Sequence, residues 1–100
     1  MSRRVTGRTP NREYTIPILR ALLELGGEGS PRDVATKVEK QMRLTSADYE
    51  DLPSGGTRWQ KTMRFTRWEL ARDGLLDRGA PKGVWRLTEL GREHAEAKHT

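Results

Sequence analysis

The sequence predicts a mainly α-helical domain that carries a small β-hairpin. Apolar residues recur at helical spacing over residues 57–73, and a glycine at position 74 stops that pattern. Two shorter apolar patterns of the same spacing precede it. After it, two short apolar segments flank a turn that contains glycine and proline. A chain of 100 residues allows one domain with one small core.

The first part of the chain is predicted to be an arm followed by a helix. Residues 1–13 are polar and rich in arginine, which is typical of a flexible basic arm. A first helix is expected over residues 16–25, with Thr15 as its cap, Pro17 in its first turn and glycines 26–27 at its end. The apolar face of this helix consists of Ile18, Leu19, Leu22, Leu23 and Leu25.

A second helix is expected over residues 31–42. Ser30 is a capping residue, Pro31 suits the first turn, and Asp33 supplies an acid at the third position. Residues 44–48 resemble another cap, which opens a single turn. The residues of the second helix expected to face inward are Val34, Ala35, Val38 and Met42.

The longest helix is expected over residues 57–73. Its core stripe consists of Trp59, Met63, Thr66 and Leu70, with Phe65 at the edge. At about 100° per residue, the opposite side carries Lys61, Arg64, Trp68 and Arg72. A helix needs no basic outer face to be stable, so this face is predicted to lie against phosphate.

The C-terminal part is predicted to form a hairpin and a last helix. Residues 75–78 and 84–87 are expected to be strands, with Trp85 and Leu87 on one face. Thr88 then caps a helix that runs to about residue 98.

This element order is that of a winged helix-turn-helix domain, here over residues 14–98. Such a domain places its long helix in the major groove of DNA, where each base pair presents a distinct pattern of donors and acceptors. The hairpin, called the wing, and a basic arm can bind the flanking backbone or minor groove.

Charge is segregated along the chain. The formal net charge is +5 and the pI is about 10.1. Residues 1–14 are net +3 and residues 57–92 net +5, whereas residues 15–56 are net −2. Two basic segments around an acidic middle indicate a polyanionic partner.

Several classes of protein and site are excluded or disfavoured. The chain has no cysteine, which excludes disulfides, thiolate metal sites and cysteine nucleophiles. It has no apolar stretch long enough to span a membrane, and its start lacks the apolar region of a signal peptide. We therefore expect a cytoplasmic, nucleoid-associated protein with no membrane partner.

Four segments resemble the Mrr-like N-terminal domain, the winged-helix module at the front of Mrr-type, modification-dependent restriction endonucleases. They are Ile-Pro-Ile-Leu-Arg-Ala-Leu at 16–22, Ser-Pro-Arg-Asp-Val-Ala at 30–35, Arg-Asp-Gly-Leu-Leu at 72–76 and Gly-Val-Trp-Arg-Leu-Thr at 83–88. The resemblance covers about residues 14–95, and it is most specific in the last two segments. It implies binding of double-stranded DNA and, more weakly, a link to restriction of modified DNA.

The chain departs from this family in two respects. Lys61 and Thr62 stand where the family usually has Asn-Arg, and Phe65 stands where it usually has Trp. The nuclease domain that normally follows is not in the sequence, which favours a stand-alone reader of DNA. A small transcriptional regulator and a winged-helix adaptor that binds proteins instead of DNA are the alternatives.

The candidate DNA-binding residues fall into three groups. Those in the first half of the long helix are expected to reach bases, since Arg and Lys pair with guanine and Gln with adenine: Arg58, Gln60, Lys61 and Arg64. Those further along or on the wing are expected to contact phosphate or remain solvated: Arg67, Arg72, Arg78, Lys82 and Arg86. Those of the arm either track DNA or belong to an ordinary tail: Arg3, Arg4, Arg8 and Arg12.

Trp68 is expected to point outward from the long helix, whereas Trp59 and Trp85 fit the core by spacing. A large exposed aromatic side chain commonly marks a contact. Trp68 can pack on another protomer of a homodimer, stack on a base, or fold back over the wing.

The sequence does not predict an enzyme. His94 and His99 lie in the polar tail and are expected to be exposed to solvent instead of binding metal. The acidic cluster of Asp48, Glu50 and Asp51 has no histidine or basic partner, and a place at a helix start explains Asp48 more simply than catalysis does. No phosphate loop, serine elbow or two-metal carboxylate set is present, and no cofactor is expected.

Overall fold

The computed structural model describes Gly7 and residues 9–97. Its elements, in chain order, are a 3₁₀ helix η1 (Asn11–Tyr14), α1 (Thr15–Glu24), β1 (Glu28–Gly29), α2 (Pro31–Gln41), α3 (Arg58–Arg72), β2 (Trp85–Arg86) and α4 (Glu89–Ala97). The predicted fold class is confirmed, because the chain is mainly helical with a small antiparallel sheet. The arrangement is compatible with a winged helix.

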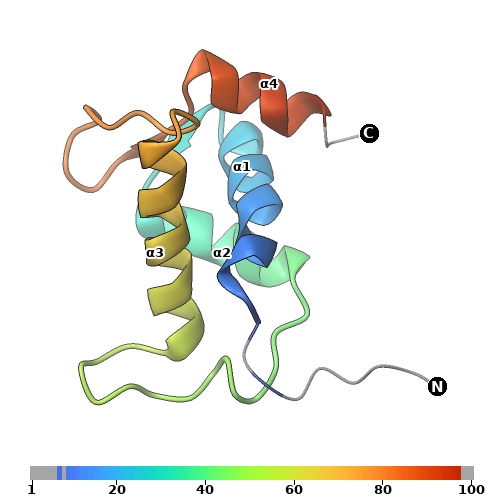
Figure 1. The fold of residues 1–100 in the computed structure, drawn as a ribbon, viewed down its shortest axis with the longest axis vertical. Coiled ribbons are helices and arrows are strands. Elements are labelled where there is room, and N and C mark those ends of the chain that lie inside the picture. The colour runs from blue at the N-terminus through green and yellow to red at the C-terminus, as the bar shows by residue number, and fades with distance from the viewer. Residues whose placement is uncertain (1–6, 8, 98–100) are drawn as a thin grey trace.

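The helices surround one core (Figure 1). α1 lies at the centre, with α2 across it, α3 on one side and α4 over one end. The predicted core stripe of α3 is confirmed, since Trp59, Met63, Thr66 and Leu70 are all buried. Val34 and Val38 of α2 are buried as well, whereas Ala35 and Met42 are only partly buried. None of the helices among the described residues is long and apolar enough to cross a membrane.

Two glycine-containing motifs end α1 and α3 as the sequence predicts. At the end of α3, Gly74 has φ +85, its N–H donates to the carbonyl of Ala71 at 3.2 Å, and the N–H of Leu75 donates to that of Leu70 at 2.9 Å. This pair of bonds is a Schellman motif, which requires a left-handed residue that glycine adopts without strain. Gly26 and Gly27 end α1 with the same pair of bonds.

The start of the domain differs from the prediction. Thr15 is not a cap: it is the first residue of α1, which continues directly from η1. The expected flexible arm does not extend to residue 13, because Thr9 is buried and residues 11–14 form η1. A side chain of α3 holds this segment in place, since the Thr66 hydroxyl donates to the carbonyl of Asn11 at 3.1 Å.

The sheet also differs from the predicted hairpin. β2 pairs with β1, in the antiparallel register Glu28↔Arg86 and Gly29↔Trp85. The expected partner segment, residues 75–78, forms no strand but lies beside β2, through the bridge between Leu76 and Leu87 and a bond of 2.8 Å from the Asp77 N–H to the Arg86 carbonyl. β2 therefore lies between two segments. Its predicted alternation is confirmed, because Trp85 and Leu87 are buried.

The cap of α4 is confirmed, and α4 sits very close to the end of α3. The Thr88 hydroxyl accepts from the N–H of Gly91 at 3.0 Å and donates to the carbonyl of Gly74 at 2.6 Å. A Cβ atom on Gly91 would lie 1.9 Å from the carbonyl oxygen of Leu75. Only glycine allows α4 to approach the chain this closely.

Candidate nucleic-acid interface

The outer face of α3 carries five exposed side chains opposite its buried stripe. They are Lys61, Arg64, Phe65, Trp68 and Arg72. Their spacing of i, i+3, i+4, i+7 and i+11 puts them within about one third of the helix circumference. The structure thus brings together cations and aromatic rings on the longest helix, and we call this set the α3 outer face.

Two cations of the α3 outer face, Lys61 and Arg64, have no hydrogen bond or ion pair to any described residue. The same holds for Arg78 and Lys82, which are exposed in the segment between α3 and β2. An unpaired cation keeps its full charge available for an anionic partner, because it loses no internal ion pair on binding. These four side chains are the strongest candidates of the predicted set.

Three other candidates are already engaged within the domain. The Gln60 amide oxygen accepts from the N–H of Thr57 at 3.2 Å, at the start of α3. Arg58 pairs with Glu50 at 3.0 Å. Arg86 donates to Glu28 at 2.8 Å and to Asp77 at 3.3 Å, and these carboxylates raise the pKa of Arg86 above its usual value, the Glu28 hydrogen bond most of all. Each of these side chains therefore already has a partner within the domain.

The aromatic side chains of the α3 outer face lie against each other. Trp68 is 53% exposed, which confirms its predicted outward position. Phe65, expected at the edge of the core, is 52% exposed and stacks on Trp68 with ring centroids 5.9 Å apart and planes at 21°. The guanidinium carbon of Arg72 lies over the Trp68 ring, 5.3 Å from its centroid. Helical geometry gives a reason for the position of Phe65, because residue 65 follows Lys61 by four and so shares its face.

A second group of cations surrounds Trp68 near the end of α3. Arg67, Arg72 and Arg78 line a hollow of about 170 Å³ together with Trp68 and Ala71. The Arg67 guanidinium lies 5.8 Å from the centre of the buried Trp85 ring. Arg72 pairs with the neighbouring Asp73 at 3.1 Å, whereas Arg78 has no ion pair to a described residue. Positive charge therefore continues from α3 to the segment between α3 and β2.

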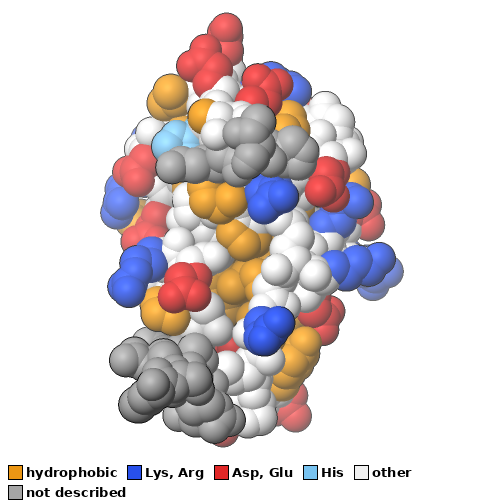
Figure 2. Space-filling view, turned by 90° about the vertical axis from the view of Figure 1, so that its right-hand side faces the viewer, with side chains coloured by type: hydrophobic (Ala, Val, Ile, Leu, Met, Phe, Trp, Pro, Cys, Tyr) orange, Lys and Arg blue, Asp and Glu red, His pale blue; other side chains and the backbone are white. Residues whose placement is uncertain are grey.

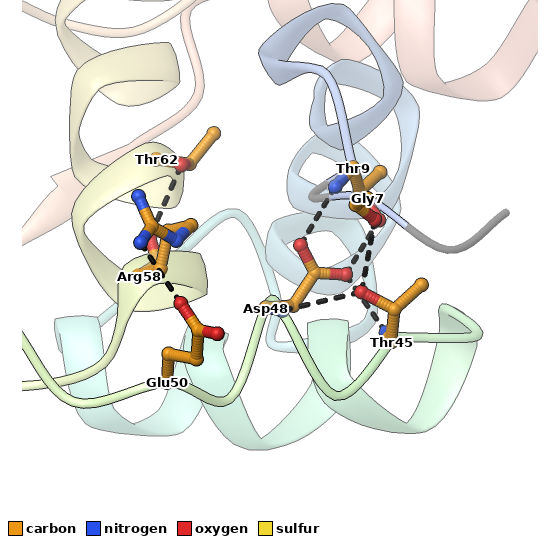
Figure 3. Close-up of polar contacts among 7 residues, drawn as sticks. All are labelled: Gly7, Thr9, Thr45, Asp48, Glu50, Arg58 and Thr62. Atoms are coloured by element: carbon orange, nitrogen blue, oxygen red, sulfur yellow. Dashed lines mark hydrogen bonds and ion pairs between the residues drawn. The ribbon is translucent and has the colours of Figure 1, made fainter.

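Asp48 joins the N-terminal segment to the loop before α3 (Figure 3). Its side chain is 1% exposed and accepts from the N–H and hydroxyl of Thr9, both at 2.6 Å, and from the N–H of Thr45 at 2.8 Å. Burial acts to raise the pKa of Asp48, but these hydrogen bonds outweigh it and lower the pKa below its usual value. The predicted cap exists, since the Asp48 N–H donates to the Thr45 hydroxyl at 3.2 Å. The bonds to Thr9 were not predicted, because no local pattern links positions 39 residues apart.

The remaining predicted residues are spread over the domain ends. Arg12 is exposed on η1, and Arg3, Arg4 and Arg8 lie outside the described residues. His94 is exposed on α4 as expected, and His99 is outside the described residues. Among residues 9–97, no group of histidine and acidic side chains is arranged to hold a metal ion.

The opposite side of the molecule has a different character. Figure 2 views it from the side away from α3, and acidic and basic side chains alternate there with apolar ones. No basic cluster comparable to that of α3 is visible on the coloured part of this face. Acidic and basic side chains are thus mixed on this face.

Comparison with known proteins agrees with the resemblance noted in the sequence. No curated protein and no solved structure matches the chain. The family model of the Mrr N-terminal domain matches residues 12–97, which includes every helix and strand from α1 to α4. The chain therefore belongs to the Mrr N-terminal domain family.

Proposed function

We propose that this chain binds double-stranded DNA through the α3 outer face. The observation that carries the proposal is the set of unpaired cations, Lys61 and Arg64 on α3 and Arg78 and Lys82 beside it. An α-helix about 10–12 Å across fits a major groove of about 12 Å width. Membership of a family associated with restriction systems supports DNA as the polyanion.

In this proposal the residues have different tasks. Lys61 and Arg64 face the base edges and nearby phosphates from the first half of α3. Arg78 and Lys82 bind the flanking backbone, and Arg72 and Trp68 contact the DNA at the far end of the helix. Gln60 and Arg86 make no DNA contact in this proposal. The side-chain oxygen of Gln60 and the guanidinium of Arg86 already make hydrogen bonds within the domain.

The biological role that we propose is the reading of modified bases in connection with restriction, without catalysis by this domain. A small transcriptional regulator is the alternative within DNA binding. Comparing the affinities of unmodified, methylated and hydroxymethylated duplexes of one sequence separates the two. Equal affinity for all three would remove the reading of modified bases.

The experiment that tests DNA binding is fluorescence anisotropy at several salt concentrations. With about 4–6 phosphate contacts, the slope of log affinity against log salt is expected to be about −4 to −5. Changing Lys61 and Arg64 to alanine should weaken binding about 10- to 100-fold and make the slope shallower by about 2. Salt-independent binding, or none to any duplex, would refute the proposal.

A charge-matched control is available at the end of α2, where Lys40 lies in the last turn and Arg43 follows the helix by two residues. Lys40 and Arg43 are exposed and have no ion pair to a described residue, and this end of α2 lies away from α3 in Figure 1. Changing both to alanine removes the same charge and should have a much smaller effect. A protein-binding adaptor is the competing class of function, and a partner captured after nuclease treatment would favour it.

A contact between two copies of the chain is the alternative role that we propose for Trp68. In that case Trp68→Ala should shift the molecule towards monomer in sedimentation and leave the affinity per protomer for DNA nearly intact. If Trp68 contacts DNA instead, the variant should lose DNA affinity and keep its oligomeric state.

A further inference from the structure

A cavity of about 540 Å³ lies where the N-terminal segment crosses the first two turns of α3. Its volume is within the range of about 300–1,000 Å³ that is usual for small-molecule sites. The residues of α3 that line it are Arg58, Lys61, Thr62 and Phe65, at i, i+3, i+4 and i+7. The other wall is formed by Thr9, Pro10 and Asn11, and by Leu52 of the loop before α3.

The N-terminal wall of the cavity is held in place by hydrogen bonds over long sequence distances. Thr9 makes its two bonds to the buried Asp48, and the Asn11 amide nitrogen donates to Glu69 of α3 at 2.6 Å. The Asn11 amide oxygen has no hydrogen-bond partner among the described residues. The wall is therefore formed before a ligand arrives and presents an acceptor with no internal partner.

The residues that line the cavity suit a ligand with a planar ring and a negatively charged group. Lys61 is unpaired, Arg58 is partly neutralised by Glu50, and no aspartate or glutamate is among the described residues that line the cavity. Phe65 offers an aromatic surface beside these cations, because half of its surface is exposed. Cations beside an exposed aromatic ring are the features by which proteins bind unpaired nucleotides, the phosphate on the cation and the base stacked on the ring.

A second copy of this chain fits the cavity less well than a nucleotide. Placing two α3 outer faces together would bring Lys61 and Arg64 of each copy close to the same cations of the other. Like charges without intervening acids repel. The only acidic residues within α3 and at its end are Glu69 and Asp73, which already bond to Asn11 and Arg72.

We infer that this cavity receives a single unpaired nucleotide of a DNA strand, with the base stacked on Phe65 and the phosphate bound by Lys61 and Arg58. The inference rests on the proposed function, since it requires α3 to face DNA. It adds that the domain distinguishes an unpaired or extruded nucleotide from a paired one. Phe65 also stacks on Trp68, which does not line the cavity.

The test compares three duplexes of one sequence by fluorescence anisotropy. One is fully paired, one carries a single unpaired nucleotide, and one carries an abasic unit at the same place. The unpaired nucleotide should raise affinity about 10-fold, as expected for one base stacked on an aromatic ring. The abasic unit should lose this gain, because it preserves the backbone distortion and removes only the base.

The variants assign the gain to the cavity. The measured quantity is the affinity for the duplex with the unpaired nucleotide divided by the affinity for the paired duplex. Phe65→Leu should lower this ratio to about one, whereas Phe65→Tyr should leave it unchanged. Both variants should fold, because Phe65 is exposed. Leu90→Ala is the control, since Leu90 is an equally exposed apolar side chain on α4 and should leave the ratio unchanged.

The outcomes are distinguishable from failure of the proposed function. Absence of binding to the fully paired duplex would refute the proposed function. The inference about the cavity would then be tested by the binding of the duplex that carries the unpaired nucleotide. Equal affinity for the paired and unpaired duplexes, or an equal gain from the abasic unit, would overturn the inference alone. A free deoxynucleoside monophosphate added in excess should reduce the gain, because it offers the same base and phosphate to the cavity.

Discussion

Replacing Asp48 by asparagine tests whether one buried carboxylate holds the N-terminal segment on the domain. Oδ1 accepts from the Thr9 N–H, and Oδ2 accepts from the Thr9 hydroxyl and the Thr45 N–H. An asparagine has one oxygen and one NH₂ group at these places. In either orientation the NH₂ group faces a backbone N–H, so at least one buried or partly buried donor loses its partner.

The size of the effect follows from these bonds. A buried donor left without a partner costs about 1–3 kcal/mol, and hydrogen bonds to a charged group contribute more than neutral ones. We therefore expect Asp48→Asn to lower the free energy of unfolding by about 2–4 kcal/mol. For a domain of this size, that corresponds to a fall of roughly 10–25 °C in the melting temperature.

Thermal unfolding followed by circular dichroism measures this effect, with Asp51→Asn as the control. Asp51 is exposed and its side chain has no hydrogen bond to a described residue, so the same chemical change should have little effect there.

The stabilisation by Asp48 should depend on pH, because its folded-state pKa is lowered. The Asp48 carboxylate stabilises the fold above its unfolded-state pKa of about 4 and loses this contribution as the pH falls through the folded-state value. The two proteins should therefore converge in strong acid. Equal stability at pH 7, or a constant difference down to pH 2, would contradict the role of the carboxylate.

Two further predictions concern the C-terminal half. Gly91→Ala should destabilise the domain by about 2–4 kcal/mol in a denaturant titration, because the added Cβ would meet the Leu75 carbonyl at 1.9 Å and α4 would have to shift. Gly79→Ala should be nearly neutral in that titration, because its Cβ would meet only a side-chain oxygen at 3.4 Å. Arg86→Gln should lower the melting temperature by only a few degrees, less at high salt, and should leave the salt slope of DNA binding unchanged, since its ion pairs are exposed and internal. A shallower slope for this variant would instead place Arg86 on the DNA.

Much of the fold can be predicted from local sequence patterns. The buried stripe of α3, its stop at Gly74 and the cap at Ser30 all depend on residues within a few positions of one another. The outward position of Trp68 follows from the same helical geometry. Such features are predictable because spacing along one helix decides which side chains share a face.

The features that sequence patterns missed depend on distant segments. β1 is two residues long, and only its pairing with β2 defines it as a strand. Thr9 bonds to the buried Asp48, and Arg86 pairs with Glu28 on the neighbouring strand. In the candidate site, residue types were therefore predictable, whereas the distinction between free and engaged cations required the fold.

The positions of the three tryptophans make the intrinsic fluorescence of the protein informative about both binding and unfolding. Trp59 and Trp85 are buried in the core, and Trp68 is the exposed one. A water-soluble quencher should therefore extinguish mainly the emission of Trp68, whereas the emission of the buried pair should change when the core opens. Occupancy of the α3 outer face and unfolding of the domain can thus be followed in one cuvette, without a label.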